Sequence, residues 1–238
     1  MTQQSLTCAT LKHSAGPLSD AGFRRWLGYG VPTEVPLGFS ERQAISTINN
    51  PTKRDVNVSD PFGLKPYIRT VEDYPISGIT FRDITSLLET PSVFVRACQE
   101  LSRLSEAFAP TAVASIESRG FIFAGPIACD LSLPMVLARK PGKLPNDAYR
   151  KEFDLEYGST ALEIQKNTAL TAADRVVIVD DLIATGGTAI ACAALLNEHF
   201  CVPRENILVL ALIDLPALGG TSLISSLGYN VGSLVEYL

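Results

Sequence analysis

Residues 176–191 read VVIVDDLIATGGTAIA, an apolar run followed by two acids and then by Thr-Gly-Gly-Thr. The run Val176–Val179 predicts a buried strand, and the apolar residues from Ala189 to Asn197 predict a helix. Asp180 and Asp181 would then lie at the carboxyl end of the strand, where ligands bind in open α/β sheets. An ordinary strand-to-helix turn needs neither the acid pair nor two glycines. The stretch therefore indicates a binding site.

The glycine-containing loop of this stretch has the properties of an anion site. Its glycines let the backbone fold closely around a ligand, and successive N–H groups at a helix start attract negative charge. No lysine follows the glycines, so the loop is not of the Walker A type. A phosphate here, with the two carboxylates accepting hydrogen bonds from ribose hydroxyls, suits a sugar phosphate; a plain strand–turn–helix is the alternative. The predicted phosphate-binding residues are Ala184, Thr185, Gly186, Gly187 and Thr188.

Strand and helix patterns alternate on both sides of this stretch. Short apolar runs predict strands at 112–116, 135–138, 175–179 and 207–213, and apolar residues at helical spacing predict helices at 92–108, 120–131 and 189–197. Alternating strands and helices form right-handed βαβ units around a parallel sheet that is covered on both faces. We therefore predict an α/β fold with a doubly wound, mainly parallel sheet.

Residues 140–165 break this rhythm. Phe153, Leu155 and Tyr157 alternate with polar residues, Gly158-Ser159 predicts a turn, and Leu162 and Ile164 alternate again. Such a pattern is typical of a β-hairpin. We expect a mobile hairpin that projects from the sheet.

Composition limits the classes of function. The chain has 238 residues, 46% of them hydrophobic, a formal charge of −5 and only two histidines. The negative charge argues against generic nucleic-acid binding, and no apolar run approaches the roughly 20 residues of a membrane span. A histidine triad or a multi-histidine metal site is nearly excluded, so carboxylates must carry acid–base chemistry. Five cysteines without a paired spacing indicate reduced thiols, and Cys129 and Cys192 are predicted to be buried.

The first 65 residues carry Gly-Pro, Val-Pro and Asn-Asn-Pro breaks and no sustained period. We interpret residues 1–65 as an irregular extension of unknown role and residues 66–238 as the functional domain. The N-terminus lacks the basic-then-apolar pattern of a secretory signal, so a cytoplasmic location is expected.

Five segments together resemble the adenine phosphoribosyltransferases, a family of type I phosphoribosyltransferases. They are VVIVDDLIATGGT, YPISGITFRDIT (74–85), ESRGFIFAGPIA (117–128), ARKPGKLP (138–145) and EFDLEYGSTALEIQK (152–166). The resemblance covers about residues 66–236. It implies a sheet with a small hood and a flexible catalytic loop at about 140–165. It also implies purine salvage: adenine and 5-phosphoribosyl 1-pyrophosphate (PRPP) give AMP and pyrophosphate through an oxocarbenium-like transition state.

The resemblance assigns the parts of PRPP to particular residues. The 5′-phosphate goes to the 184–188 loop and the ribose hydroxyls to Asp180 and Asp181. Mg²⁺ would arrive on the pyrophosphate, with no direct protein ligand expected, and the peptide before Ser118 is often cis in the family. A solvated basic turn before Pro141 is the alternative for Arg139 and the two lysines. The pyrophosphate-binding residues implied are Ser118, Arg119, Arg139, Lys140 and Lys143.

The resemblance also implies a site for adenine and a catalytic acid. The purine would lie between Phe81 and Leu215, although both could equally be plain core residues. Glu156 would assist proton movement at the purine when the loop closes, with Tyr157 helping to latch it; an exposed strand acid is the alternative. The implied adenine-binding residues are Thr80, Phe81, Arg82, Leu182 and Leu215.

The resemblance further implies a homodimer. Phe121, Ile122 and Phe123 are consecutive apolar residues that one helix cannot turn toward a single core, which favours a second buried surface. Alternatively, residues 1–65 cover this patch. Two other functions remain open: a related enzyme that uses hypoxanthine, xanthine or orotate, and a PRPP-binding transcription regulator. The regulator is disfavoured because residues 1–65 lack a basic amphipathic helix.

Overall fold

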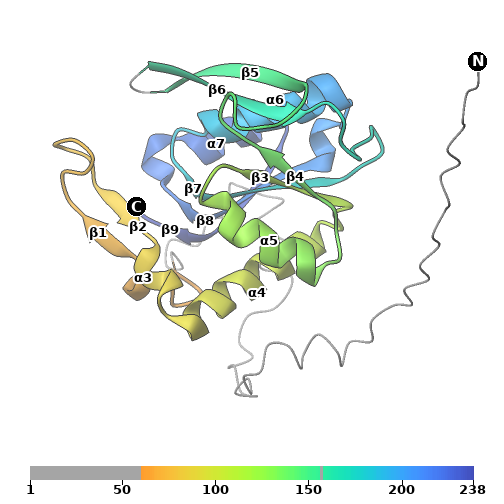
Figure 1. The fold of residues 1–238 in the computed structure, drawn as a ribbon. Helices are drawn as coiled ribbons and strands as arrows, with labels where there is room; N and C mark the ends of the chain where they lie inside the picture. The colour runs from red at the N-terminus through yellow and green to blue at the C-terminus, as the bar shows by residue number, and fades with distance from the viewer. Residues whose placement is uncertain (1–59, 156–157) are drawn as a thin grey trace, which may run out of the picture. The chain divides into compact units, whose positions relative to one another are not determined.

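A computed structural model of the protein describes residues 60–155 and 158–238 (Figure 1). Residues 1–59, which form most of the predicted extension, lie outside the described residues, as do Glu156 and Tyr157. The described residues therefore include the predicted 66–238 domain, apart from Glu156 and Tyr157.

The centre of the fold is a parallel sheet of five strands in the order β4-β3-β7-β8-β9. The apolar runs that predicted strands form it, because β-branched and aliphatic side chains suit a sheet buried on both faces. This confirms the predicted α/β, doubly wound fold; the edge strand β9 was not anticipated. The strands are β3 (Ala112–Ile116), β4 (Met135–Ala138), β7 (Val176–Ile183), β8 (Ile207–Asp214) and β9 (Asn230–Glu236).

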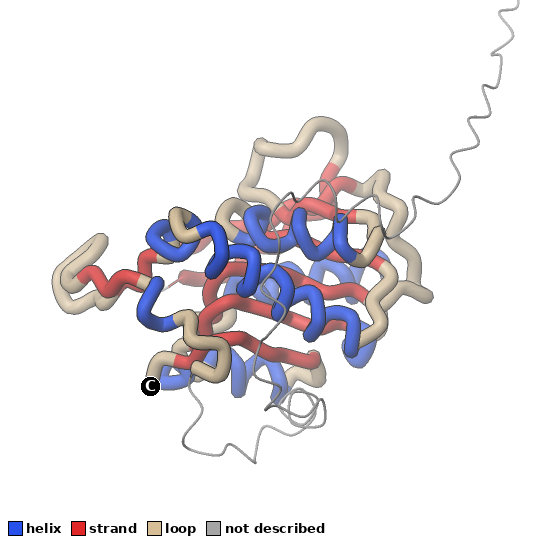
Figure 2. Tube along the Cα trace, turned by 90° about the horizontal axis from the view of Figure 1, so that it is seen from below, coloured by secondary structure: helices blue, strands red, loops and turns tan. Residues whose placement is uncertain are grey.

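Helices cover both faces of this sheet (Figure 1). On one face lie α4 (Pro91–Ala107) and α5 (Gly120–Asp130), whose apolar residues share a core with alternate residues of the strands; we call it the α4/α5-side core. On the other face lie α6 (Gly187–Phe200) and α7 (Gly220–Ser226), which contribute to what we call the α6-side core. Figure 2 shows helices lying across the strands when the molecule is seen from below.

The order of the strands reverses between β3 and β7. From β3 the chain passes through α5 to β4 on one side, whereas β7 pairs with the other side of β3 and leads through α6 to β8. At such a reversal the connecting helices lie on opposite faces and leave a crevice at the carboxyl ends of the two strands. The loops after β3 and β7 border this crevice.

The predicted hairpin is present as β5 (Ala148–Leu155) and β6 (Gly158–Gln165), paired antiparallel up to Leu155 opposite Gly158. The predicted turn at Gly158-Ser159 is wrong, because these two residues pair with Leu155 and Asp154 and begin β6. Its arms do not project freely, however. Leu162 and Ile164 are buried in the α6-side core, and the ring of Tyr149 stacks on His199 of α6 at 4.2 Å between centroids. The expectation of a projecting insert is therefore wrong for β5 and β6, because their apolar side chains are shielded from water by packing against the α6-side core.

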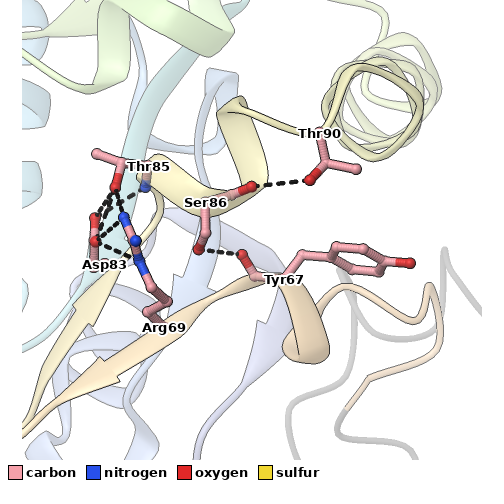
Figure 3. Close-up of polar contacts among 6 residues, drawn as sticks. All are labelled: Tyr67, Arg69, Asp83, Thr85, Ser86 and Thr90. Atoms are coloured by element: carbon pink, nitrogen blue, oxygen red, sulfur yellow. Dashed lines mark hydrogen bonds and ion pairs between the residues drawn. The ribbon is translucent and has the colours of Figure 1, made fainter.

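A second hairpin, β1 (Arg69–Val71) and β2 (Phe81–Asp83), forms a separate two-stranded sheet. A polar network ties it to the short helix α3 (Thr85–Leu88), as Figure 3 shows. Arg69 donates to both Asp83 and Thr85, at 3.1 Å and 2.6 Å. Three single-turn 3₁₀ helices complete the described elements: η1 (Lys65–Tyr67), η2 (Arg204–Asn206) and η3 (Pro216–Leu218).

Three details differ from the sequence predictions. Strand β7 continues to Ile183, so Asp180 and Asp181 lie within it; the pairing with β8 carries the strand on after the pairing with β3 has ended at Val179. Helix α6 begins at Gly187 rather than Ala189. Cys129 is exposed near the end of α5, whereas Cys192 is buried as predicted.

Candidate active site

The loop after β3 lies against the middle of β7. Gly120, the first residue of α5, makes this approach possible, because a Cβ there would lie only 2.5 Å from the carbonyl oxygen of Val179. No other residue type fits without displacing one of the two elements. The contact brings Ser118 and Arg119 to the acid pair of β7.

In the acid pair, Asp181 is buried and paired with a cation, whereas Asp180 is half-buried. Asp181 is 4% exposed, and its Oδ2 lies 2.9 Å from Nη1 of Arg119. Oδ1 of Asp180 accepts a hydrogen bond from the backbone N–H of Asp181 at 2.8 Å. Burial, together with the negative charge of Asp181, raises the pKa of Asp180 well above its ordinary value. Burial also raises the pKa of Asp181, although Arg119 opposes that shift. The pair can therefore accept hydrogen bonds from hydroxyl groups, at a cost to the stability of the free protein.

The loop after β7 has only three residues, Ala184–Gly186, between the strand and α6. Gly186 caps the helix with φ of +84°, a left-handed conformation that favours glycine. The first N–H groups of any α-helix lack acceptors within it, and here they belong to Gly187 and the residues after it. The predicted phosphate loop thus has the geometry of an anion site at the start of a 14-residue helix.

Gly220 at the start of α7 closely packs against this phosphate loop. Its N–H donates to the carbonyl oxygen of Ala184 at 3.1 Å. A Cβ at Gly220 would lie 2.2 Å from that oxygen and 2.7 Å from the nitrogen of Gly186. The loop is therefore supported by backbone contacts from a segment far along the chain. Sequence reasoning missed Gly220; its only signal was the pair Gly219-Gly220 ahead of an apolar stretch.

The predicted pyrophosphate residues surround Glu117. The peptide between Glu117 and Ser118 is cis, as the resemblance implies. Arg139 donates to both carboxylate oxygens of Glu117, at 3.1 and 3.3 Å, and to the carbonyl oxygen of Lys143 at 2.8 Å. The N–H of Lys140 also donates to Glu117, at 3.0 Å. The side chain of Arg139 therefore organises the loop that carries the exposed Lys140 and Lys143.

Sequence analysis did not single out Glu117. Burial works to raise its pKa, but the hydrogen bonds and charge of Arg139 and the Lys140 amide hold that pKa below the ordinary value. Glu117 stays a carboxylate and fixes Arg139. The strand register explains the contact. Ile116 of β3 pairs with Ala138 of β4, so Glu117 and Arg139, which follow them, are neighbours.

The predicted adenine residues come from three elements. Thr80 and Phe81 belong to the β1–β2 hairpin, where Thr80 donates to Glu72 at 2.8 Å and the ring of Phe81 meets Tyr74 edge-on at 5.1 Å. Leu182 and Leu215 are half-buried against the α4/α5-side core. The guanidinium of Arg119 lies 5.4 Å from the centroid of Phe81. Arg119 thus pairs with Asp181 and also lies over the ring of Phe81, a predicted adenine residue.

Two predicted residues, Glu156 and Tyr157, lie outside the described residues. The described part of the chain contains no group of three or more histidine, cysteine or carboxylate side chains arranged to hold a metal ion. None of its helices has the length and apolar content of a membrane span.

An acid pair, a glycine-capped helix start and a basic loop lie together at the switch point of a doubly wound sheet, the arrangement that the sequence predicts for a phosphorylated sugar. The model of the phosphoribosyl transferase domain family matches residues 83–209, which include both loops. The protein therefore belongs to the class that contains a phosphoribosyl transferase domain.

Comparison with known proteins narrows this class. An adenine phosphoribosyltransferase of Sinorhizobium medicae is 45% identical over 170 residues, which are 71% of this chain and 92% of that protein. One from Synechococcus sp. is 51% identical over 135 residues, 57% of this chain and 78% of its own length. The chain belongs to the adenine phosphoribosyltransferase family.

Solved structures agree with this assignment. The adenine phosphoribosyltransferase of Thermoanaerobacter pseudethanolicus is 38% identical with a TM-score of 0.67, covering 73% of this chain and 98% of that one. The enzyme of Giardia lamblia, solved with 9-deazaadenine, is 34% identical with a TM-score of 0.68, covering 73% and 95%.

Proposed function

We propose that this protein transfers the 5-phosphoribosyl group of PRPP to N9 of adenine, giving AMP and pyrophosphate in purine salvage. The observation that carries the proposal is the position of Arg119, which pairs with Asp181 at 2.9 Å and lies 5.4 Å from the Phe81 ring. One side chain thus joins the predicted ribose acids to the predicted adenine wall. A site for a sugar phosphate alone would not need that link.

PRPP is proposed to lie along the crevice between the two loops. The 5′-phosphate accepts hydrogen bonds from the amides at the start of α6 and from Thr185 and Thr188, while Asp180 and Asp181 accept from the ribose hydroxyls. The pyrophosphate lies at the loop after β3, where Ser118 and Arg119 and the exposed Lys140 and Lys143 provide donors and positive charge. Arg139 supports this side by holding the loop in place.

The reaction breaks the bond between C1′ and the pyrophosphate oxygen and forms the bond between N9 and C1′. The leaving group takes the electron pair, and the proton of N9 must be removed. Positive charge develops on the ribose ring, and the carboxylates of Asp180 and Asp181 stabilise it electrostatically. We assign proton movement at the purine to Glu156, with Tyr157 helping to close the hairpin over the site.

Mg²⁺ is proposed to enter with PRPP and to offset the charge of the leaving pyrophosphate. The carboxylates of Asp180 and Asp181 are hard oxygen donors that suit this ion. However, Asp181 is already paired with Arg119, and two carboxylates do not make a complete protein site. The ion would therefore be held mainly through the phosphate oxygens of PRPP.

Adenine is proposed to lie between Phe81 and Leu215, with the backbone around Thr80 and Arg82 reading its Watson–Crick edge. Accepting from the exocyclic amine and donating to N1 favours adenine over 6-oxopurines, which present the reverse pattern. Leu182 completes the apolar wall.

A two-fold homodimer is also proposed. Phe123 is fully buried and the half-buried Ile122 packs against the same core, whereas the half-buried Phe121 is not part of it, so the apolar run on α5 is not satisfied by one core alone. Sedimentation equilibrium tests this: a mass that stays at the 25.6 kDa monomer at micromolar concentration contradicts it. We further propose a cytoplasmic location, which cell fractionation tests.

The decisive experiment incubates the full chain with PRPP, Mg²⁺ and, separately, adenine, hypoxanthine, guanine, xanthine or orotate. AMP should form from adenine, with far less product from the other bases; product from a different base alone contradicts the proposal. A second experiment tests Glu156. Glu156→Gln should lower kcat roughly 10²-fold while PRPP binding changes little, and near wild-type turnover would remove Glu156 from the mechanism.

A further inference from the structure

The chain ends beside the predicted adenine wall. Tyr237 directly follows β9, and its backbone N–H donates to the carbonyl oxygen of Asp214 at 3.0 Å. Asp214 is the last residue of β8 and precedes Leu215, whose own N–H donates to Ile183 at 3.0 Å. The backbone of Tyr237 is therefore fixed to the segment that carries one side of the adenine site.

The side chain of Tyr237 reaches the other side. The guanidinium carbon of Arg82 lies 4.0 Å from the centroid of its ring, and Nζ of Lys65 lies 5.0 Å from the same centroid. Arg82 is the central residue of β2 and follows Phe81 directly. Figure 1 shows the C-terminus next to β2. A cation over an aromatic face at this distance is an attractive contact.

This contact matters because the two walls belong to different sheets. Phe81 lies in the two-stranded β1–β2 sheet, and Leu215 follows a strand of the five-stranded sheet. No ladder of backbone hydrogen bonds joins these sheets in the described structure, so side-chain packing sets their separation. Ile68 and Ile84 anchor the outer parts of the hairpin in the α4/α5-side core. Tyr237 acts on β2 itself, one residue from Phe81.

We infer that Tyr237 is a positioning residue for the purine: it holds Arg82, and through it Phe81, at a fixed distance from Leu215. The inference rests on the proposed function, because adenine is the ligand that would fill the space. Burial raises the pKa of the Tyr237 hydroxyl, with Arg82 opposing the shift, so the side chain stays a neutral phenol at physiological pH. The ring, rather than the hydroxyl, makes the contact with Arg82.

The test compares Tyr237→Leu with Tyr237→Phe in the full chain. Tyr237→Leu keeps an apolar side chain but removes the aromatic face, and should raise the KM for adenine about 5- to 20-fold, the size of a partly desolvated cation–π contact. The KM for PRPP and kcat should change by less than about twofold, since the sugar-binding loops are untouched. Tyr237→Phe, which keeps the ring, should restore the KM for adenine.

The chain offers a matched control at the opposite end of β9. Tyr229, just before that strand, is 6% exposed and lies under a cation in the same way, with Arg204 5.6 Å from its ring centroid. Tyr229→Leu removes an equivalent contact far from the carboxyl edge of the sheet. It should lower the melting temperature without a selective change in the KM for adenine. Kinetics of all variants are measured below the lowest melting temperature.

Two further measurements separate positioning from a general structural role. Calorimetric titration with AMP should show weaker binding to Tyr237→Leu but not to Tyr229→Leu. The variant Arg82→Met should raise the KM for adenine, and adding Tyr237→Leu should cause little further change if Tyr237 acts through Arg82.

The outcomes distinguish this inference from the proposed function. Wild-type protein that forms no AMP contradicts the function itself. Active wild-type protein overturns the inference alone if Tyr237→Leu leaves the KM for adenine unchanged or raises both KM values equally. The inference is also overturned if Tyr237→Leu fails to fold and Tyr237→Phe binds AMP less tightly than the wild-type protein does.

Discussion

The two loops that border the crevice achieve their geometry by different means. The loop after β7 contains no charged residue and is shaped by backbone contacts, with Gly186 against Gly220. The loop after β3 is shaped by ion pairs, with Glu117 on Arg139 and Arg119 on Asp181. Substitutions at the backbone contacts of the first loop should therefore have steric and severe effects. In the second loop, Gly120 makes a similar close approach to β7, but substitution of the charged residues should have electrostatic and graded effects. Substitutions in and around the two loops test this contrast.

Gly220→Ala should cause the largest loss. A Cβ 2.2 Å from the Ala184 carbonyl oxygen cannot be accommodated, so α7 or the phosphate loop must shift. Displacement of a binding group by about 1 Å can cost 10²-fold, and we expect kcat/KM for PRPP to fall by about that much. The matched control is Gly125→Ala in α5, where an added Cβ meets nothing within 4 Å. Equal activity in the two variants would remove Gly220 from the support of the loop.

Asp180→Asn tests the strand between the two loops. Loss of a charged acceptor for the ribose hydroxyls should lower kcat/KM by about 10- to 10²-fold, the range for hydrogen bonds to charged groups. The same change should raise the melting temperature at pH 7. Because folding raises the pKa of Asp180, the folded protein binds a proton more tightly, and stability falls as the pH rises from the unfolded pKa to the folded one. Asparagine removes that cost.

The control for this stability effect is Asp174, a carboxylate with the opposite shift. Burial alone would raise its pKa, but hydrogen bonds from Thr111 and Thr171 lower it overall. Asp174 therefore contributes stability above the unfolded pKa that is lost as the pH falls through the folded one. Asp174→Asn should lower the melting temperature at pH 7. If Asp180→Asn also lowered the melting temperature, the charge of Asp180 would not destabilise the folded protein.

Glu117→Gln should have a smaller effect on activity. It leaves the shape of the side chain but weakens its hold on Arg139 and on the Lys140 amide. We expect kcat/KM for PRPP to fall about tenfold, as for removal of one charge-assisted contact. Glu100→Gln is the control, since its pair with Arg103 at 2.9 Å lies on the surface of α4. A rise in PRPP affinity for Glu117→Gln would instead indicate that Arg139 binds the anion directly once released.

Ser115→Ala should leave activity unchanged and affect only stability. The Ser115 hydroxyl is fully buried in β3 and has no hydrogen-bond partner among the described residues. Its removal should raise the free energy of unfolding by about 1 kcal/mol. In Ser105→Ala the buried hydroxyl lost is one that donates to Leu101 at 2.8 Å, so stability should fall. Urea unfolding of both variants measures this difference, and a loss of stability in Ser115→Ala would contradict the account.

The amino-acid sequence determined strands β3, β4, β7 and β8 of the central sheet, the helices between them and the glycine-containing loop after β7. These features depend on patterns within short windows, such as the apolar run of β7 followed by the acid pair and two glycines. Such patterns can be recognised in the sequence because apolar periodicity and the backbone freedom of glycine act within a few residues. The resemblance added the cis peptide before Ser118, which no local pattern predicts.

Only the tertiary structure decided which distant residues support the site. Strand β9, the β1–β2 hairpin and the packing of the β5–β6 arms on α6 were not predicted as such, because each depends on a surface made elsewhere in the chain. The same holds for Gly220 against Gly186, Glu117 on Arg139 and Tyr237 on Arg82. Each contact joins segments whose separation is set by strand order and helix packing. A short stretch of sequence contains only one residue of each pair. The contact stabilises the site only after folding has brought both residues together.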